Sequence, residues 1–237
     1  GNYNTVVGDE AGTAITTGDG NTAVGYQALD ANTTASDNTA IGRAAGTAIT
    51  TGFNNALVGR NAGDALTIGN SNTAVGMNAL SAEVAGDRSV AVGYGSLTAQ
   101  TNASTVDTYN VAVGYNAGGA VTTGVQNTLI GGLAGDAITT ANENTAVGYQ
   151  ALSATTTGAK NTAIGYTALD VNTEGEFNTA VGRNALGGNT TADGNVAVGN
   201  NAMLANTTGT DNVAVGTAAL DANTTADNNT SVGKSSL

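Results

Sequence analysis

A short phrase, Asn-Thr-Ala-Val-Gly or a close variant, recurs along the whole chain and alternates polar and apolar positions before each glycine. The closing glycines are Gly8, Gly25, Gly42, Gly59, Gly76, Gly93, Gly114, Gly131, Gly148, Gly165, Gly182, Gly199, Gly216 and Gly233. Every interval is 17 residues except one of 21, between Gly93 and Gly114. A fixed period this short is typical of a solenoid, in which each repeat covers the apolar face of its neighbours. The pattern therefore predicts a single repeat region over residues 1–237.

The residues before each glycine predict a short β-strand. With the closing glycine as position 0, position −1 is Val or Ile in every copy, −2 is usually Ala, and −3 is usually Thr or Val. Such β-branched runs bounded by Gly and Asn favour strands, whereas recurrent Gly and Asn-Thr-Thr disfavour a helix. A second extended piece is predicted at Ala-x-Thr-Thr, as in residues 31–34 and 205–208. The predicted fold class is all-β, a parallel β-solenoid of about 14 coils.

Two columns of the repeat vary together. Where position +4 is Gly, as at Gly46, position +7 is apolar, as at Ile49. Where position +4 is Leu or Met, as at Leu152, position +7 is polar, as at Thr155. One large apolar side chain per coil, supplied from either position, fills a pocket that two would overfill and none would leave empty. Together with the position −1 residues, the predicted core comprises Val24, Leu29, Ile41, Ile49, Val147, Leu152, Ile164 and Leu169.

Position −4 is Asn in thirteen copies, with Ser89 as the exception. Stacked coils lie about 4.8 Å apart, so identical amides are expected to hydrogen-bond to the copies above and below. The predicted asparagine ladder includes Asn21, Asn38, Asn55, Asn72, Asn127, Asn144, Asn161 and Asn178. The constant glycine at position 0 predicts a bend or a close backbone approach where a Cβ would clash.

The one 21-residue interval predicts a loop insertion at residues 101–109, on one edge of one coil. Loops accept insertions at low cost, so a bulge is the first interpretation and a functional protrusion the second.

Composition narrows the chemistry. The chain has no His and no Cys, so the usual general bases, nucleophiles and transition-metal ligands are missing, and we expect no enzyme activity, cofactor or metal. The scattered carboxylates fit turn propensity. The net charge of −12 disfavours nucleic acid and anionic membranes as partners. The chain begins and ends within a repeat, so we expect an excised segment with flanking fibre domains.

Position +1 is the most variable exposed column and is rich in Tyr and Arg, which are common at interfaces. Its candidate contact residues are Tyr26, Arg43, Arg60, Tyr94, Tyr115, Tyr149, Tyr166 and Arg183. They are expected to face neighbouring subunits or, alternatively, a receptor glycan. Paired threonines, such as Thr33 and Thr34, raise ice binding as a further alternative, although only one of each pair points outward.

The phrase Asn-Thr-Ala-Val-Gly-Tyr-Gln-Ala-Leu, at residues 21–29 and again at 144–152, resembles the β-roll repeats of YadA-type trimeric autotransporter adhesin heads and of bacteriophage tail fibres. The YadA-type repeat is nearer 14 residues, shorter than the 17 of this chain. The resemblance implies a homotrimeric fibre of chains lying side by side or intertwined, on a virion tail or a bacterial cell surface. The expected function is a non-enzymatic extracellular shaft that supports attachment to a host or surface; a head that binds a receptor or glycan directly is the alternative.

Overall fold

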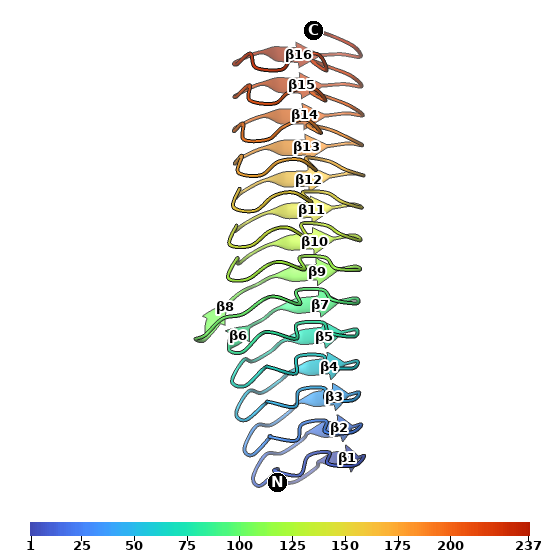
Figure 1. Ribbon diagram of the computed structural model, residues 1–237, viewed down its shortest axis with the longest axis vertical. Coiled ribbons are helices and arrows are strands. Elements are labelled where there is room, and N and C mark those ends of the chain that lie inside the picture. The colour runs from blue at the N-terminus through green and yellow to red at the C-terminus, as the bar shows by residue number, and fades with distance from the viewer. The chain divides into compact units, whose positions relative to one another are not determined.

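The structure of the chain is a computed structural model that describes residues 1–237, in two compact units, Gly1–Thr123 and Gly124–Leu237. Each unit carries a ladder of seven short strands in chain order (Figure 1). In the first unit these are β1 (Thr5–Val7), β2 (Thr22–Val24), β3 (Thr39–Ile41), β4 (Ala56–Val58), β5 (Thr73–Val75), β7 (Val90–Val92) and β9 (Val111–Val113), with a separate pair, β6 (Gly86–Asp87) and β8 (Val106–Asp107). In the second unit they are β10 (Thr128–Ile130), β11 (Thr145–Val147), β12 (Thr162–Ile164), β13 (Thr179–Val181), β14 (Val196–Val198), β15 (Val213–Val215) and β16 (Thr230–Val232).

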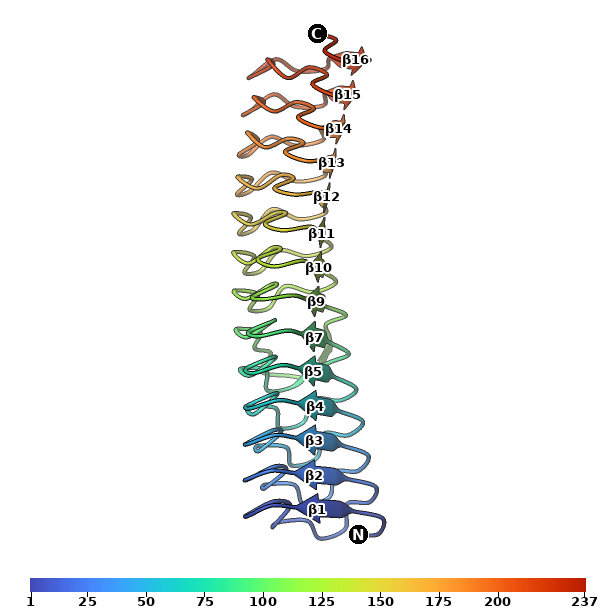
Figure 2. The same ribbon diagram turned by 90° about the vertical axis from the view of Figure 1, so that its right-hand side faces the viewer.

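Neighbouring strands pair in parallel, with each residue opposite its equivalent in the next repeat. Thr22 pairs with Thr39, and Thr145 with Thr162, one 17-residue period apart. The register also survives the insertion, because Val90 pairs with Val111 across the 21-residue interval. The prediction of an all-β parallel β-solenoid with a 17-residue period is confirmed, and Figure 2 shows the strands of each unit stacked in columns. The chain has no helix that is long and apolar enough to cross a lipid bilayer.

The inward side of each strand is position −2, and this corrects part of the predicted core. Ala23 and Ala146 are completely buried, whereas Ile41 and Ile164 at position −1 are 40% exposed. Val24 and Val147 are also only partly buried. Successive residues of a strand point to opposite faces, so only one of the two apolar columns can face inward. Because the coil is thin, the small alanine fits on the strand side, opposite the large side chain that comes from position +4 or +7.

The large interior side chains come from the two alternative positions. Leu29, Leu152 and Leu169 at position +4 and Ile49 at position +7 are all fully buried.

Two coils depart from the rule of one large group per coil. Leu57 and Leu129 occupy the inward strand position and are fully buried beside Leu66 and Ile138. Both coils have glycine at position +4, and a Cβ on Gly63 would lie 2.9 Å from Cδ2 of Leu57. The missing side chain at position +4 therefore makes room for both large groups.

The glycine at position 0 meets both expectations. Gly148 has a φ of +134°, and an added Cβ would lie 2.4 Å from the carbonyl oxygen of Gly165 in the next coil. Both a bend and a close approach therefore exclude a side chain there.

Three further positions per coil adopt left-handed backbone angles, and most of the residues at them are not glycine. Gln27, Leu29 and Asp37, at positions +2, +4 and −5 of their repeats, have φ values of 56°, 51° and 59°. A left-handed leucine is unfavourable by itself, and burial of its side chain compensates.

The second extended piece is not a strand, which corrects that prediction. Residues 31–34 and 205–208 form turns and bends. A single carbonyl, that of Thr33, accepts hydrogen bonds from the backbone N–H groups of both Thr16 and Thr17, at 3.0 and 3.2 Å. Two donors on one acceptor replace the regular alternation that a strand ladder requires.

Candidate functional site

The position −4 asparagines form a buried ladder, mostly through bonds between side chain and backbone. Asn161 is representative: its backbone N–H donates to Oδ1 of Asn144 at 2.9 Å, and its Nδ2 donates to the carbonyl of Gly175 at 2.8 Å. Its own Oδ1 accepts from the backbone N–H of Asn178 at 3.0 Å. Each amide therefore bonds to backbone groups of the following coil, while its own backbone N–H donates to the amide of the preceding coil, and this column serves stability rather than ligand binding. The other predicted ladder residues are also buried, and the backbone N–H groups of Asn38 and Asn55 donate to the asparagine of the preceding coil in the same way.

A second polar ladder, which was not predicted from the sequence, runs through position +7. Asn189 is fully buried; its Nδ2 donates to Oδ1 of Asn172 at 3.0 Å and to the carbonyl of Ala192 at 3.1 Å. Asn206 continues the ladder by donating to Asn189. The signal was present in the recurrence of Asn at that column, and the hydrogen-bonding role could have been inferred from it.

Carboxylates at the turns also act within the fold. The backbone N–H of Thr210 donates to Oδ1 of Asp227 at 2.7 Å, and that of Glu176 donates to Oδ1 of Asp193 at 2.7 Å. These acids accept from backbone donors of the preceding coil, which explains their position without a cation. No group of three or more acidic residues is placed to hold a metal ion.

Three other aspartates are partly desolvated. Burial raises the pKa of Asp64, Asp136 and Asp170, and backbone hydrogen bonds offset only part of that effect. Each lies at position +5 of its repeat, one residue after the inward-facing position. They therefore oppose folding slightly at neutral pH, a feature of stability rather than of a reaction.

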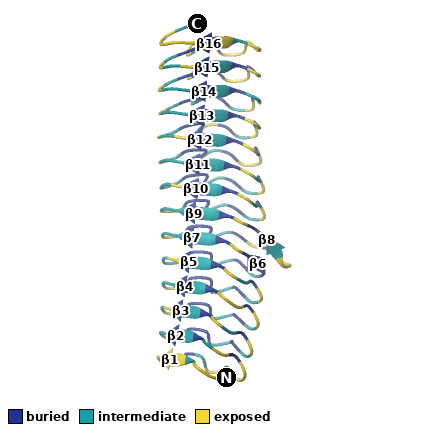
Figure 3. Ribbon diagram, turned by 180° about the vertical axis from the view of Figure 1, so that it is seen from behind, coloured by how far each residue is buried: buried dark blue, intermediate teal, exposed yellow.

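The outward side of the strands carries positions −3 and −1, which we call the strand face. In the second unit it runs from Thr128 and Ile130 to Thr230 and Val232, and in the first from Thr5 and Val7 to Val111 and Val113. Most strands are coloured as intermediate in burial in Figure 3, and no residue of either column is charged. The more exposed aliphatic residues at position −1 are Val7, Ile41, Val75, Ile130, Ile164, Val215 and Val232. This column, predicted as core, instead forms an apolar stripe on the surface of each unit.

The position +1 column lies next to the strand face in the sequence, and all of its Tyr and Arg residues are exposed. Tyr94 stacks on Tyr115 with ring centroids 5.5 Å apart and an interplanar angle of 12°, and Tyr149 stacks on Tyr166 at 5.7 Å and 20°. Tyr26 has no such partner; a hydrogen bond with Glu10 raises its pKa. Arg43, Arg60 and Arg183 are exposed. In each stacked pair, one face of each ring is covered by its neighbour.

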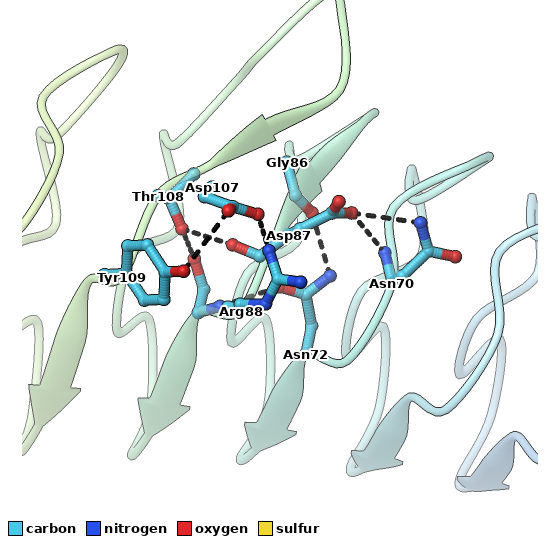
Figure 4. A network of polar contacts seen from close by, with 9 residues as sticks. Asn70, Asn72, Gly86, Asp87, Arg88, Asp107, Thr108 and Tyr109 are labelled. Atoms are coloured by element: carbon cyan, nitrogen blue, oxygen red, sulfur yellow. Dashed lines mark hydrogen bonds and ion pairs between the residues drawn. The ribbon is translucent and has the colours of Figure 1, made fainter.

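The insertion forms a protrusion that is tied to the coil beneath it. Strand β8 of the loop pairs in parallel with β6, with Val106 opposite Gly86. Figure 4 shows the contacts: Arg88 forms an ion pair with Asp107, and the hydroxyl of Tyr109 donates to Asp107 at 3.2 Å. Arg88 also lies over the Tyr109 ring, at 5.8 Å from its centroid. The ion-pair side chains are about half exposed, so their contribution to stability is small.

A buried polar cluster lies beneath this loop and includes Ser89, which interrupts the asparagine column. Gln100, fully buried, donates from Nε2 to Oγ of Ser89 and to Oε2 of Glu83, both at 2.8 Å. Oε1 of Gln100 accepts from Nδ2 of Asn110 at 2.9 Å, so Gln100 connects Ser89 to the next asparagine of the column. The Ser89 hydroxyl meets that of Thr108 at 2.6 Å, and Thr108 in turn donates to the carbonyl of Asp87 at 2.8 Å.

Glu83 is the one fully buried acid in this cluster, and neutral donors surround it. Its Oε1 accepts from the backbone N–H groups of residues 84, 85, 86 and 102, at distances of 2.7 to 3.1 Å. Its Oε2 accepts from the amides of Gln100 and Asn102, each at 2.8 Å. Every acceptor of this carboxylate is used, so it anchors the insertion and is not aimed at a ligand.

A cavity of about 320 Å³ lies over the last coil and is lined by Leu220, Asn223, Ser236 and neighbouring residues. A solenoid coil presents such a hollow wherever no further coil covers it, and no cluster of charged groups lines this one.

No protein-family model matches the chain, and no curated protein and no solved structure is significantly similar to it. The architecture therefore rests on this structure, and the kinship to adhesin or tail-fibre proteins remains a resemblance in the repeat phrase.

Proposed function

We propose that this chain is a non-enzymatic shaft segment of an extracellular fibre that supports attachment, of the kind that its repeat phrase resembles in trimeric adhesins and phage tail fibres. The observation that carries the proposal is the use of nearly every buried polar group for coil-to-coil contact. Asn161 and Glu83 illustrate this: their side chains bond only to neighbouring coils and turns. A body built in this way gains length and stiffness with each repeat and offers no interior site for a substrate.

The stacked tyrosines support a shaft over a glycan-binding head. Sugar rings bind to the open face of an aromatic side chain, and the Tyr149 and Tyr166 rings cover one face of each other. Ice binding has even less support, because the hydroxyl of the first threonine of each pair is hydrogen-bonded within the protein. Thr156, for example, donates its hydroxyl to the carbonyl of Thr173 at 3.2 Å. The resemblance further implies three copies lying side by side, on a virion or a bacterial surface.

The proposal is tested on the intact fibre by removing whole 17-residue repeats, such as residues 149–165. A shaft becomes shorter by about 4.8 Å per repeat in electron micrographs and still supports attachment. The matched variant replaces Tyr149, Tyr166 and Arg183 with alanine at unchanged length. Loss of attachment in that variant, with the fold intact, would instead assign receptor binding to the column itself.

A further inference from the structure

The strand face of each unit is an uncovered side of a parallel sheet. Parallel sheets normally have both faces covered, because both carry apolar side chains. Here the inner face packs on the coil interior, while the outer face presents Val and Ile at position −1, including Ile164 at 40% exposure. Contiguous apolar stripes of this kind on a soluble surface mark interaction sites.

The side chains of the strand face are suited to a rigid contact. Position −1 is β-branched in every strand, and position −3 is Thr or Val in every strand except at Ala56. β-branched side chains have few rotamers, so little side-chain entropy is lost when they are buried by a partner. Their spacing along the ladder repeats with each coil, at about 4.8 Å.

The charge distribution around the strand face favours one kind of partner. The chain carries a net charge of −12, yet the strand face has no charge at all. The adjacent position +1 column holds Arg43, Arg60, Arg183 and Lys234, four of the six basic residues in the chain. An acidic partner is therefore attracted to this side and meets the least repulsion there.

From the uncovered face of the parallel sheet, the regular spacing of its side chains and the basic residues beside it, we infer that the strand face docks a second copy of this chain. A second copy is acidic, and its columns repeat with the same spacing, so equivalent rows of side chains meet in register along the whole length of a unit. This inference rests on the proposed shaft function and adds which surface joins the copies.

The size of the contact sets its expected strength. Seven strands at about 4.8 Å, each three residues long at about 3.3 Å per residue, give a footprint on the order of 300 Å² per unit. A standard specific interface takes about 800 Å² from each partner. Because the footprint is smaller than that of a standard stable interface, we expect self-association through one unit's face to be weak and reversible.

The test compares two exposed aliphatic residues of the same unit. Ile164 lies on the strand face and Val171 lies in a turn at position +6, and each is 40% exposed. Ile164→Glu and Val171→Glu add the same charge to side chains of similar kind. The self-association constant of the whole chain and of both variants is measured by sedimentation velocity up to about 100 μM, with circular dichroism to verify folding.

We expect Ile164→Glu to weaken self-association by about tenfold or more, as for a buried interface residue, and Val171→Glu by less than about twofold. Equal effects of the two variants would overturn the assignment of the strand face while leaving self-association and the shaft proposal intact. A wild-type chain that stays monomeric would overturn the docking inference itself. The shaft proposal is judged separately, by fibre length and attachment.

Discussion

Gly148 lies so close to Gly165 of the next coil that a single added methyl group would overlap its carbonyl oxygen, at 2.4 Å. The same relationship recurs at position 0 in both units, as between Gly25 and Gly42, where the distance is 2.6 Å. This contact sets the spacing of the coils and explains why no other residue type stands at this position.

Gly148→Ala therefore should be among the most damaging substitutions. It places a Cβ against the backbone of the next coil and forces alanine into a φ of +134°. We expect a loss of about 4 kcal/mol or more in the free energy of unfolding, measured by thermal or denaturant unfolding. Gly132→Ala is the control, because its Cβ would come no nearer than 3.6 Å to the Tyr149 ring. A similar loss in both variants would contradict the close-contact explanation.

The two-position packing rule can be tested by converting one coil into the other type. Leu152→Gly empties the interior and should cost about 3 kcal/mol. Thr155→Ile alone overfills it and should cost about 1–3 kcal/mol. In the double variant the isoleucine takes the place of the leucine, as Ile138 does beside Gly135 in the preceding coil. We expect the double variant to recover at least half of the combined loss; costs that simply add would refute the rule.

The sequence predicted this alternation and the 17-residue register, because both depend only on which columns vary together. It did not predict which side of the strand faces inward. Alternation separates Ala23 from Val24 but does not say which is inside, and hydrophobicity favours the valine. The narrow coil selects the alanine instead, and this is a property of three-dimensional packing.

The left-handed backbone conformations also could not be predicted from the sequence. Left-handed angles are usually signalled by Gly or Asn, whereas here Leu29 and Gln27 adopt them. The burial of Glu83 could not be predicted either, because an acidic residue at a column whose other polar members are uncharged is expected at the surface. Only the meeting of residues 83, 100 and 102 in space shows that its carboxylate is fully bonded.

Removal of one ladder amide should cost more than the loss of one hydrogen bond. In Asn161→Ala the backbone N–H of Asn178 loses its partner inside the protein, whereas the carbonyl of Gly175 loses one bond and keeps the other, from Nδ2 of Asn172. One buried donor left without a partner, together with the lost bond to Gly175, should lower the free energy of unfolding by about 1–3 kcal/mol. Asn200→Ala, at an exposed position, should change it by less than about 0.5 kcal/mol. Denaturant unfolding of both variants gives the comparison, and a near-neutral Asn161→Ala would argue against the ladder.

The desolvated aspartates give stability an unusual dependence on pH. Because burial raises the pKa of Asp170 above its ordinary value of 3.8, the folded chain takes up a proton before the unfolded chain does. This contribution is fully present below pH 3.8 and is lost as the pH rises through the folded-state pKa. Asp170→Asn should therefore raise the melting temperature at pH 7 and reduce the difference between the melting temperatures at pH 7 and about pH 4.

Asp221→Asn removes the same charge from an exposed position and is the matched control. If both variants change the pH dependence equally, net charge rather than local burial is the cause.

The central claim is that each 17-residue repeat is one interchangeable coil held in register by its neighbours. Deletion of residues 149–165 removes one whole coil and joins Gly148 to the position +1 residue Tyr166, as in every other repeat. Deletion of residues 149–164 removes one residue fewer and shifts each following column by one place, turning the strand face inward. Thermal unfolding of the two variants by circular dichroism is the most direct test. We predict that the first keeps a cooperative transition within about 5 °C of the parent chain, while the second loses far more. Equal stability of the two deletions would contradict the account.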